Sequence, residues 1–165
     1  MQIQIERLTP EAFAPYGDVI RQPTAEPHAT GPGWQWWGET LTLRGDNRSE
    51  VVGYLRLEPA ARSFDWAERH MRSAEVIVPL GGACLVYVGP AEHLEQPGHL
   101  PELDRFRVFE VPEGQGVVLS PGVWHGAPLA VDHAMSALVL LKQGTGATDV
   151  SVVRFAETPV EIVAE

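Results

Sequence analysis

Short runs of β-favouring residues, separated by prolines and glycines, recur along the whole chain. The 14 prolines and 16 glycines are spread rather than clustered, which is typical of strands joined by turns. We expect strands over residues 34–43, 51–57, 62–70, 75–79, 83–89, 105–111, 117–119, 123–127, 134–142 and 150–155. Ten short strands in one chain indicate a closed or nearly closed β structure.

One short helix is expected before these strands. Thr9 is suited to cap it, Pro10 fits its first turn, and the helix should end by residues 15–17, outside the barrel. Residues 22–33 have no periodicity and indicate a loop, and residues 90–101 form a polar insert. A length of 165 residues suits one hydrophobic core, so residues 1–165 are expected to form one domain.

Charge and cysteine content narrow the range of partners and compartments. The chain has 22 acidic and 12 basic side chains, a formal charge of -10, which disfavours binding to nucleic acid or to anionic membranes. Cys84 is the only cysteine, so no intramolecular disulfide is expected. Without a signal-peptide pattern or a long apolar run, a cytoplasmic protein with a small-molecule partner is predicted.

The run over residues 62–70 places a carboxylate and an imidazole on the apolar side of a predicted strand. Side chains alternate across a strand, so one face carries Phe64, Trp66, Glu68 and His70. The opposite face, expected to meet solvent, carries Ser63, Asp65 and Arg69. Burying Glu68 and His70 is costly unless they pair, hydrogen-bond or bind a metal.

The spacing of these residues resembles the two sequence motifs of cupins. Glu68, His70, Glu75 and Gly82 follow the first motif, with Glu68 where a histidine usually stands. Residues 116–125 resemble the second motif, in which a Pro-Gly turn presents a histidine, here His125. The resemblance implies an all-β double-stranded β-helix, a jelly-roll barrel, with one short N-terminal helix.

Together the two motifs supply two carboxylates and two imidazoles: Glu68, His70, Glu75 and His125. This mixture of oxygen and nitrogen ligands suits a divalent transition metal such as Ni, Mn, Fe or Zn, with positions left for substrate. The alternative is that they are hydrogen-bonded core residues in a cupin without metal.

A more specific resemblance covers nearly the whole chain. Residues 8–20, the Glu68-Arg69-His70 triplet, residues 114–117 and residues 122–125 occur in the same order as in the ureidoglycolate lyase family. The resemblance implies a homodimeric enzyme that splits (S)-ureidoglycolate into glyoxylate and urea in allantoin breakdown, with a divalent metal. In this family His70 and His125 correspond directly, and Glu68 matches an acidic residue.

Several positions depart from the family pattern, namely Glu75, Gly126, Lys142 and the tryptophans of residues 34–37. They leave two alternatives open: a metal-dependent isomerase or oxygenase acting on another small acid, and a non-catalytic cupin that binds a small acid. In the lyase hypothesis, Glu75 or Glu68 relays a proton to the leaving nitrogen.

Lys142 and the tryptophans of residues 34–37 have competing interpretations. Lys142 ends an apolar strand and is the candidate cation for a substrate carboxylate, or else a solvated lysine. The tryptophans are expected to pack in the core, or to line the pocket or a dimer face.

Overall fold

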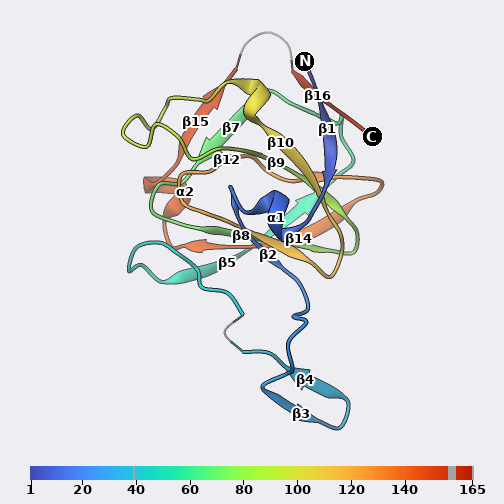
Figure 1. The fold of residues 1–165 in the computed structure, drawn as a ribbon. Helices are drawn as coiled ribbons and strands as arrows, with labels where there is room; N and C mark the ends of the chain where they lie inside the picture. Colours follow the sequence, from blue (N-terminus) through green and yellow to red (C-terminus); the bar gives the residue numbers. More distant parts are fainter. Residues whose placement is uncertain (39, 156–158, 165) are drawn as a thin grey trace.

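A computed structural model describes residues 1–38, 40–155 and 159–164 of the chain. Within these residues, nine strands form one large sheet. Eight of them neighbour one another in the order β15 (Ser151–Arg154), β7 (Trp66–Arg69), β12 (Trp124–His125), β9 (Cys84–Gly89), β10 (Arg107–Val111), β1 (Gln2–Arg7), β16 (Val160–Val163) and β6 (Ser63–Phe64) (Figure 1). The ninth strand, β13 (Leu129–Ala130), pairs with β9. The smaller sheet has the order β2 (Gly17–Ile20), β11 (Gly116–Leu119), β8 (Glu75–Leu80), β14 (Met135–Lys142), β5 (Glu50–Leu57).

The main core lies between the two sheets. The small sheet contributes alternate residues of β8, β11 and β14, and the large sheet contributes alternate residues of β9 and β10; the central members are Ile77, Val86, Val88, Phe109, Val117, Leu119 and Ala137. This period of two is what the pleat of a half-buried strand produces. The two curled sheets around this core confirm the all-β, cupin-type fold that the sequence predicts.

The outer face of the large sheet carries a second apolar cluster. Its members include Leu85, Tyr87, Phe106 and Trp124, with Leu100 and Leu103 packed against them. Arg69 lies on this face and is fully buried, so the expectation that it faces solvent is wrong. Its guanidinium donates to main-chain carbonyls of the 90–101 insert, which covers this part of the sheet.

The predicted strand over residues 62–70 is two strands rather than one. A bend at Asp65 separates β6, which pairs with β16, from β7, which pairs with β12 and β15. Phe64 consequently packs in the outer cluster, stacked on Tyr87 with ring centroids 4.0 Å apart. The expectation that Phe64 shares a face with Glu68 is therefore wrong, because β6 and β7 pair with different strands and the bend between them breaks the alternation of side chains.

The early helix forms as predicted. It is α1 (Pro10–Phe13), and the Thr9 side chain accepts a hydrogen bond from the main-chain N–H of Ala12 at 3.1 Å. Phe13 is fully buried and meets Phe109 edge to face, with centroids 5.2 Å apart, so the helix also contributes to the core. The second helix, α2 (Thr145–Thr148), and the 3₁₀ turn Leu103–Arg105 were not predicted.

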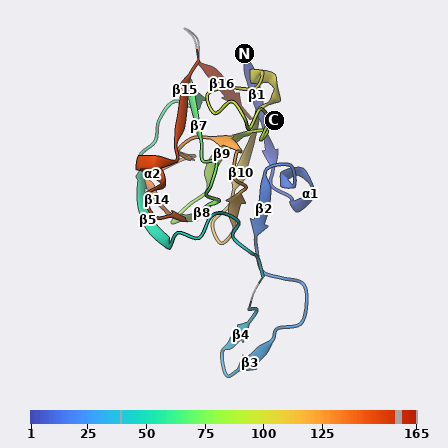
Figure 2. The same cartoon turned by 90° about the vertical axis from the view of Figure 1, so that its left-hand side faces the viewer.

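A hairpin of β3 (Ala29–Gly31) and β4 (Trp34–Trp36) projects away from both sheets in two perpendicular views (Figures 1 and 2). Trp36 is 60% exposed, so core packing is wrong for this residue. The Trp37 indole donates to the Ala25 carbonyl at 2.8 Å; the Trp34 side chain is outside what the structure describes. No helix among the described residues is long and apolar enough to cross a membrane.

Candidate metal centre

The turn between β7 and β8 carries two of the predicted site residues. His70 follows the last residue of β7, and Glu75 is the first residue of β8. Glu75 pairs with Leu119 of β11, a core residue, and residues directly opposite each other share a face of the sheet. The Glu75 side chain therefore points between the sheets, where it is buried.

His125 and Glu68 come from neighbouring strands of the large sheet. They are direct partners across β12 and β7, and His125 also pairs with Val88, a residue of the main core. Both side chains are thus directed between the sheets toward β8. His125 is 2% exposed, whereas Glu68 is half-buried.

A glycine turn links the two motifs. The main-chain N–H of Gly122 donates to the His70 carbonyl at 2.7 Å, and Val123 N–H closes the turn onto the Ser120 carbonyl at 3.2 Å. Gly122 has a φ of +87°, a conformation that side-chain-bearing residues rarely adopt. This turn fixes the start of β12 against the end of β7, which brings the two histidines together.

Both histidines lie close to Glu68 and to Glu75. One ligand atom each of Glu68, His70 and His125 lie within 4.8 Å of one another. Glu75 Oε2 lies 3.1 Å from His70 Nε2 and 3.4 Å from His125 Nε2. The structure therefore places each of the two carboxylates that the motifs single out near both histidines.

Hydrogen bonds to main-chain carbonyls determine which nitrogen each imidazole presents. His70 Nδ1 is 2.8 Å from the Asp149 carbonyl, and His125 Nδ1 is 3.0 Å from the Val123 carbonyl. A carbonyl only accepts, so each Nδ1 carries the hydrogen and donates it. In the neutral rings both Nε2 atoms then hold free lone pairs aimed at Glu75, the arrangement that metal-binding histidines use.

The charges in this cluster reinforce one another. Burial alone would raise the pKa of the Glu75 carboxyl, but the charge of His125 and the contacts from both imidazoles outweigh it and lower that pKa to about 2. Burial also opposes a charged His125, yet the Glu75 carboxylate prevails and raises the His125 pKa above its ordinary value. Glu75 is consequently an anion at neutral pH, and it attracts a positive charge to the point between the imidazoles.

Comparison with known proteins identifies the family. The model of the ureidoglycolate lyase family matches residues 1–163. The chain belongs to this family. It is 31% identical over 149 residues to the ureidoglycolate lyase of Pseudomonas savastanoi, covering 86% of this chain and 84% of the relative. It is also 31% identical over 150 residues to the ureidoglycolate lyase of Azotobacter vinelandii, covering 87% of each chain.

Solved structures resemble the chain more distantly. A sugar 3,4-ketoisomerase from Thermoanaerobacterium thermosaccharolyticum has a TM-score of 0.44 at 16% identity, covering 61% of this chain and 64% of the isomerase. The oxalate decarboxylase of Lactobacillus farciminis has a TM-score of 0.43 at 13% identity, covering 68% of this chain and 30% of that protein.

The donor set of this member of the ureidoglycolate lyase family fits a divalent ion. Within the described residues, His125 Nε2 is a buried nitrogen without a hydrogen-bond partner, although it faces the Glu75 carboxylate. A buried polar atom left unpaired is costly, and a cation between Nε2 and the carboxylate would satisfy both. Imidazole nitrogens with carboxylate oxygens are ligands that transition metals accept.

The structure does not bring Lys142 to this cluster. Lys142 Nζ lies 3.1 Å from Glu50 Oε1, its partner across β14 and β5. Leu140, two residues earlier, packs with Val76 in the cluster on the outer face of the small sheet. Lys142 shares that outer face, whereas Glu75 points from the inner one, so pleating separates them.

Sequence reasoning missed the structural roles of two residues that support the site. Arg69 ties the strand between Glu68 and His70 to the 90–101 insert, and Asp149 accepts the hydrogen bond from the His70 ring. Asp149 is 79 positions from His70 in the chain. Its carboxylate is buried, but nothing in the sequence near position 149 indicates this.

Proposed function

We propose that the chain cleaves (S)-ureidoglycolate to glyoxylate and urea, as a carbon–nitrogen lyase. The observation that carries this proposal is the buried pair of imidazoles that aims two Nε2 atoms at the Glu75 carboxylate, in a chain of the ureidoglycolate lyase family. The curated relatives carry the name of this activity.

His70, His125 and Glu75 are proposed to hold a divalent transition ion of the Mn, Fe, Ni or Zn group, and Glu68, the fourth ligand that the motifs predict, lies beside the two histidines. When bound, such an ion would supply Lewis-acid chemistry, which would lower the pKa of the hydroxyl of a 2-hydroxy acid. The chain contributes a pre-oriented ligand set, because both imidazoles are fixed through Nδ1 before any ion arrives.

The two carboxylates are proposed to have different tasks. Glu75 is held between both imidazoles and has a low pKa, so it stays anionic and serves as a ligand. Glu68 is half-buried, and within the described part of the chain its carboxylate makes no hydrogen bond or ion pair. It is therefore the freer group and the better carrier of a proton.

Cleavage moves one proton within the substrate. The hydroxyl loses its proton, the C–N bond breaks as the carbonyl of glyoxylate forms, and the released nitrogen gains a proton to give urea. Glu68 is proposed to accept the first proton and to return it to the nitrogen, a general acid–base role that contributes about 10²–10⁴-fold to rate.

Steady-state formation of glyoxylate and urea tests this division of roles. Glu68→Gln should lower kcat by about 100-fold or more while retaining most metal affinity, whereas Glu75→Gln should lose the metal. Glu58→Gln changes an exposed carboxylate of an ion pair with Arg56 and is the control. Wild-type protein that binds metal but releases neither product would contradict the lyase assignment and favour a binding cupin or an enzyme for another small acid.

We also propose that the chain works as a homodimer, as the family resemblance implies. Strand β5 lies at the edge of the small sheet, and its Val52 and Tyr54 side chains are 66% and 70% exposed. Apolar and aromatic side chains on one exposed strand are typical of interfaces.

A further inference from the structure

The side chain of one buried acid, Asp149, contacts the segment that carries His70. Asp149 follows α2 and its side chain is 4% exposed. Its Oδ1 accepts the main-chain N–H of Met71 at 3.0 Å, and its Oδ2 accepts that of Arg72 at 2.9 Å. The main-chain carbonyl of the same residue accepts the Nδ1–H of His70 at 2.8 Å. One residue therefore contacts three consecutive positions.

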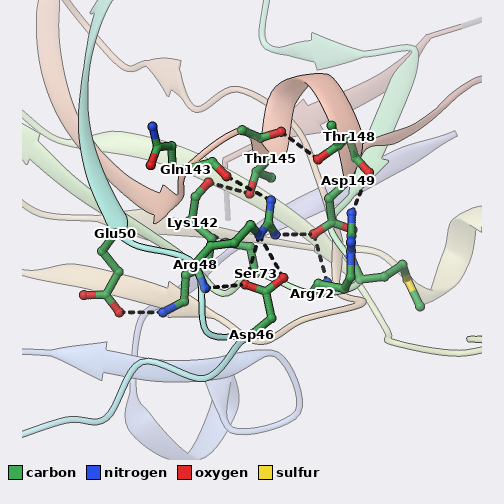
Figure 3. A network of polar contacts seen from close by, with 12 residues as sticks. Asp46, Arg48, Glu50, Arg72, Ser73, Lys142, Gln143, Thr145, Thr148 and Asp149 are labelled. Atoms are coloured by element: carbon green, nitrogen blue, oxygen red, sulfur yellow. Dashed lines mark hydrogen bonds and ion pairs between the residues drawn. The ribbon is translucent and has the colours of Figure 1, made fainter.

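Two arginines hold Asp149 in place (Figure 3). Arg48 Nη2 lies 3.4 Å from Asp149 Oδ2, and Arg72 Nε lies 3.5 Å from Oδ1. Arg48 is itself fixed, because its Nε donates to Asp46 at 2.8–2.9 Å and its Nη1 donates to the Gln143 carbonyl at 3.0 Å. The network thus ties the loop before β5, the end of β14 and the turn after β7 to one carboxylate.

We infer that Asp149 is a positioning residue for the metal centre. It sets His70 in the form that carries hydrogen on Nδ1 and presents the bare Nε2 atom to the ion. The carbonyl makes the contact with the ring, and the carboxylate, neutralised by Arg48 and Arg72, keeps that carbonyl at a fixed place relative to residues 70–72. Outer groups of this kind change metal affinity about 10–100-fold when they are removed. The inference rests on the proposed metal centre but not on the identity of the substrate.

A carboxylate, rather than an amide, is needed at position 149 to accept both main-chain hydrogen bonds. The two main-chain N–H groups bind different oxygens of the carboxylate. An asparagine at this position has one acceptor oxygen and a nitrogen that only donates, so it satisfies one of the two and repels the other. Asp149→Asn should therefore weaken the positioning of His70, and Asp149→Ala should remove it.

Two measurements test the inference. Titration calorimetry of metal-free protein with Zn²⁺ should show an affinity lower by about 10–100-fold for Asp149→Ala, with a smaller loss for Asp149→Asn. Asp132→Asn, which alters an exposed acid in an ion pair with Arg62, should bind Zn²⁺ like the wild type. Nitrogen NMR of the wild-type, metal-free protein should show the His70 hydrogen on Nδ1, and in folded Asp149→Asn this preference should weaken.

The outcomes separate this inference from the proposed function. A folded Asp149→Ala variant with wild-type Zn²⁺ affinity would overturn it. If that variant does not fold, the wild-type spectrum decides alone, because hydrogen on Nε2 of His70 would overturn the inference without any variant. Protein that shows the expected Zn²⁺ affinities and spectrum but does not cleave ureidoglycolate contradicts the proposed function and supports the inference.

Discussion

Replacing Arg69 with methionine should release the 90–101 insert from the outer face of the large sheet and lower the stability of the protein. Arg69 is fully buried, and its guanidinium donates to the carbonyls of Glu92, His93, Gln96 and Pro97 at 2.6–3.0 Å. It also stacks on the Trp124 ring, with its central carbon 4.6 Å from the ring centroid. Methionine keeps most of the apolar contact and removes the hydrogen bonds.

The magnitude follows from these four hydrogen bonds. A bond from a charged donor contributes about 1.5–3 kcal/mol when its loss leaves a buried partner unpaired. Most of residues 92–97 are exposed, so the freed carbonyls regain water and the loss per bond is reduced to about 1 kcal/mol. Arg69→Met should therefore lower the free energy of unfolding by about 4 kcal/mol.

Urea denaturation of wild type and Arg69→Met measures this loss directly, and hydrogen exchange of residues 90–101 locates it. Arg56→Met is the control, because Arg56 makes an exposed ion pair with Glu58 whose removal should cost about 0–1 kcal/mol. A loss below about 1 kcal/mol for Arg69→Met, or unchanged exchange in the insert, would refute the structural role given to Arg69.

Three further predictions concern packing, pH and assembly. Gly126→Ala should destabilise the protein by about 1–3 kcal/mol in urea denaturation, because the added Cβ would lie 1.6 Å from the buried Tyr87 hydroxyl. Gly146→Ala is the control, since a Cβ at this position meets nothing within 4 Å and should be tolerated. Equal losses of stability in the two variants would contradict this prediction. In thermal melts, metal-free protein should lose stability at both ends of the pH range. The loss above pH 6.5 occurs as pH rises through the raised pKa of His125. The loss below pH 4.5 occurs as pH falls toward the Glu75 pKa of about 2. Zn²⁺-loaded protein should become more stable above pH 6.5, since the ion binds unprotonated imidazole, and parallel curves would contradict this. Sedimentation equilibrium should give twice the chain mass of 18.1 kDa, and a monomer would contradict the homodimer.

The parts of the fold that depend on local pattern could be predicted from the sequence. Thr9 and Pro10 define a helix start on their own, and alternation along the strand places Glu68 inward. The bend at Asp65 could not be predicted, because it arises where the chain changes partner from β16 to β12. The register of β14 likewise decides which face Lys142 occupies, and that register depends on distant strands.

The site was predictable where its residues fall into motifs and not where they are contributed by tertiary packing. His70, Glu75 and His125 lie at spacings that the fold reuses, so their convergence could be expected. Asp149 acts through a main-chain carbonyl, which any residue type possesses, so no residue pattern reveals it. Arg69 resembles a solvent-facing strand residue until the insert that covers it is known.

Metal content of the purified protein tests the central claim most directly. After incubation with Mn, Fe, Ni or Zn and removal of free ions, elemental analysis should find about one ion per wild-type chain, held by the His70, His125 and carboxylate set. His125→Ala should remain folded and lose the ion, whereas His99→Ala, a change at an exposed histidine, should keep it. Wild-type protein that retains none of these ions, or His125→Ala protein with unchanged stoichiometry, would contradict the assignment of this cluster as a metal centre.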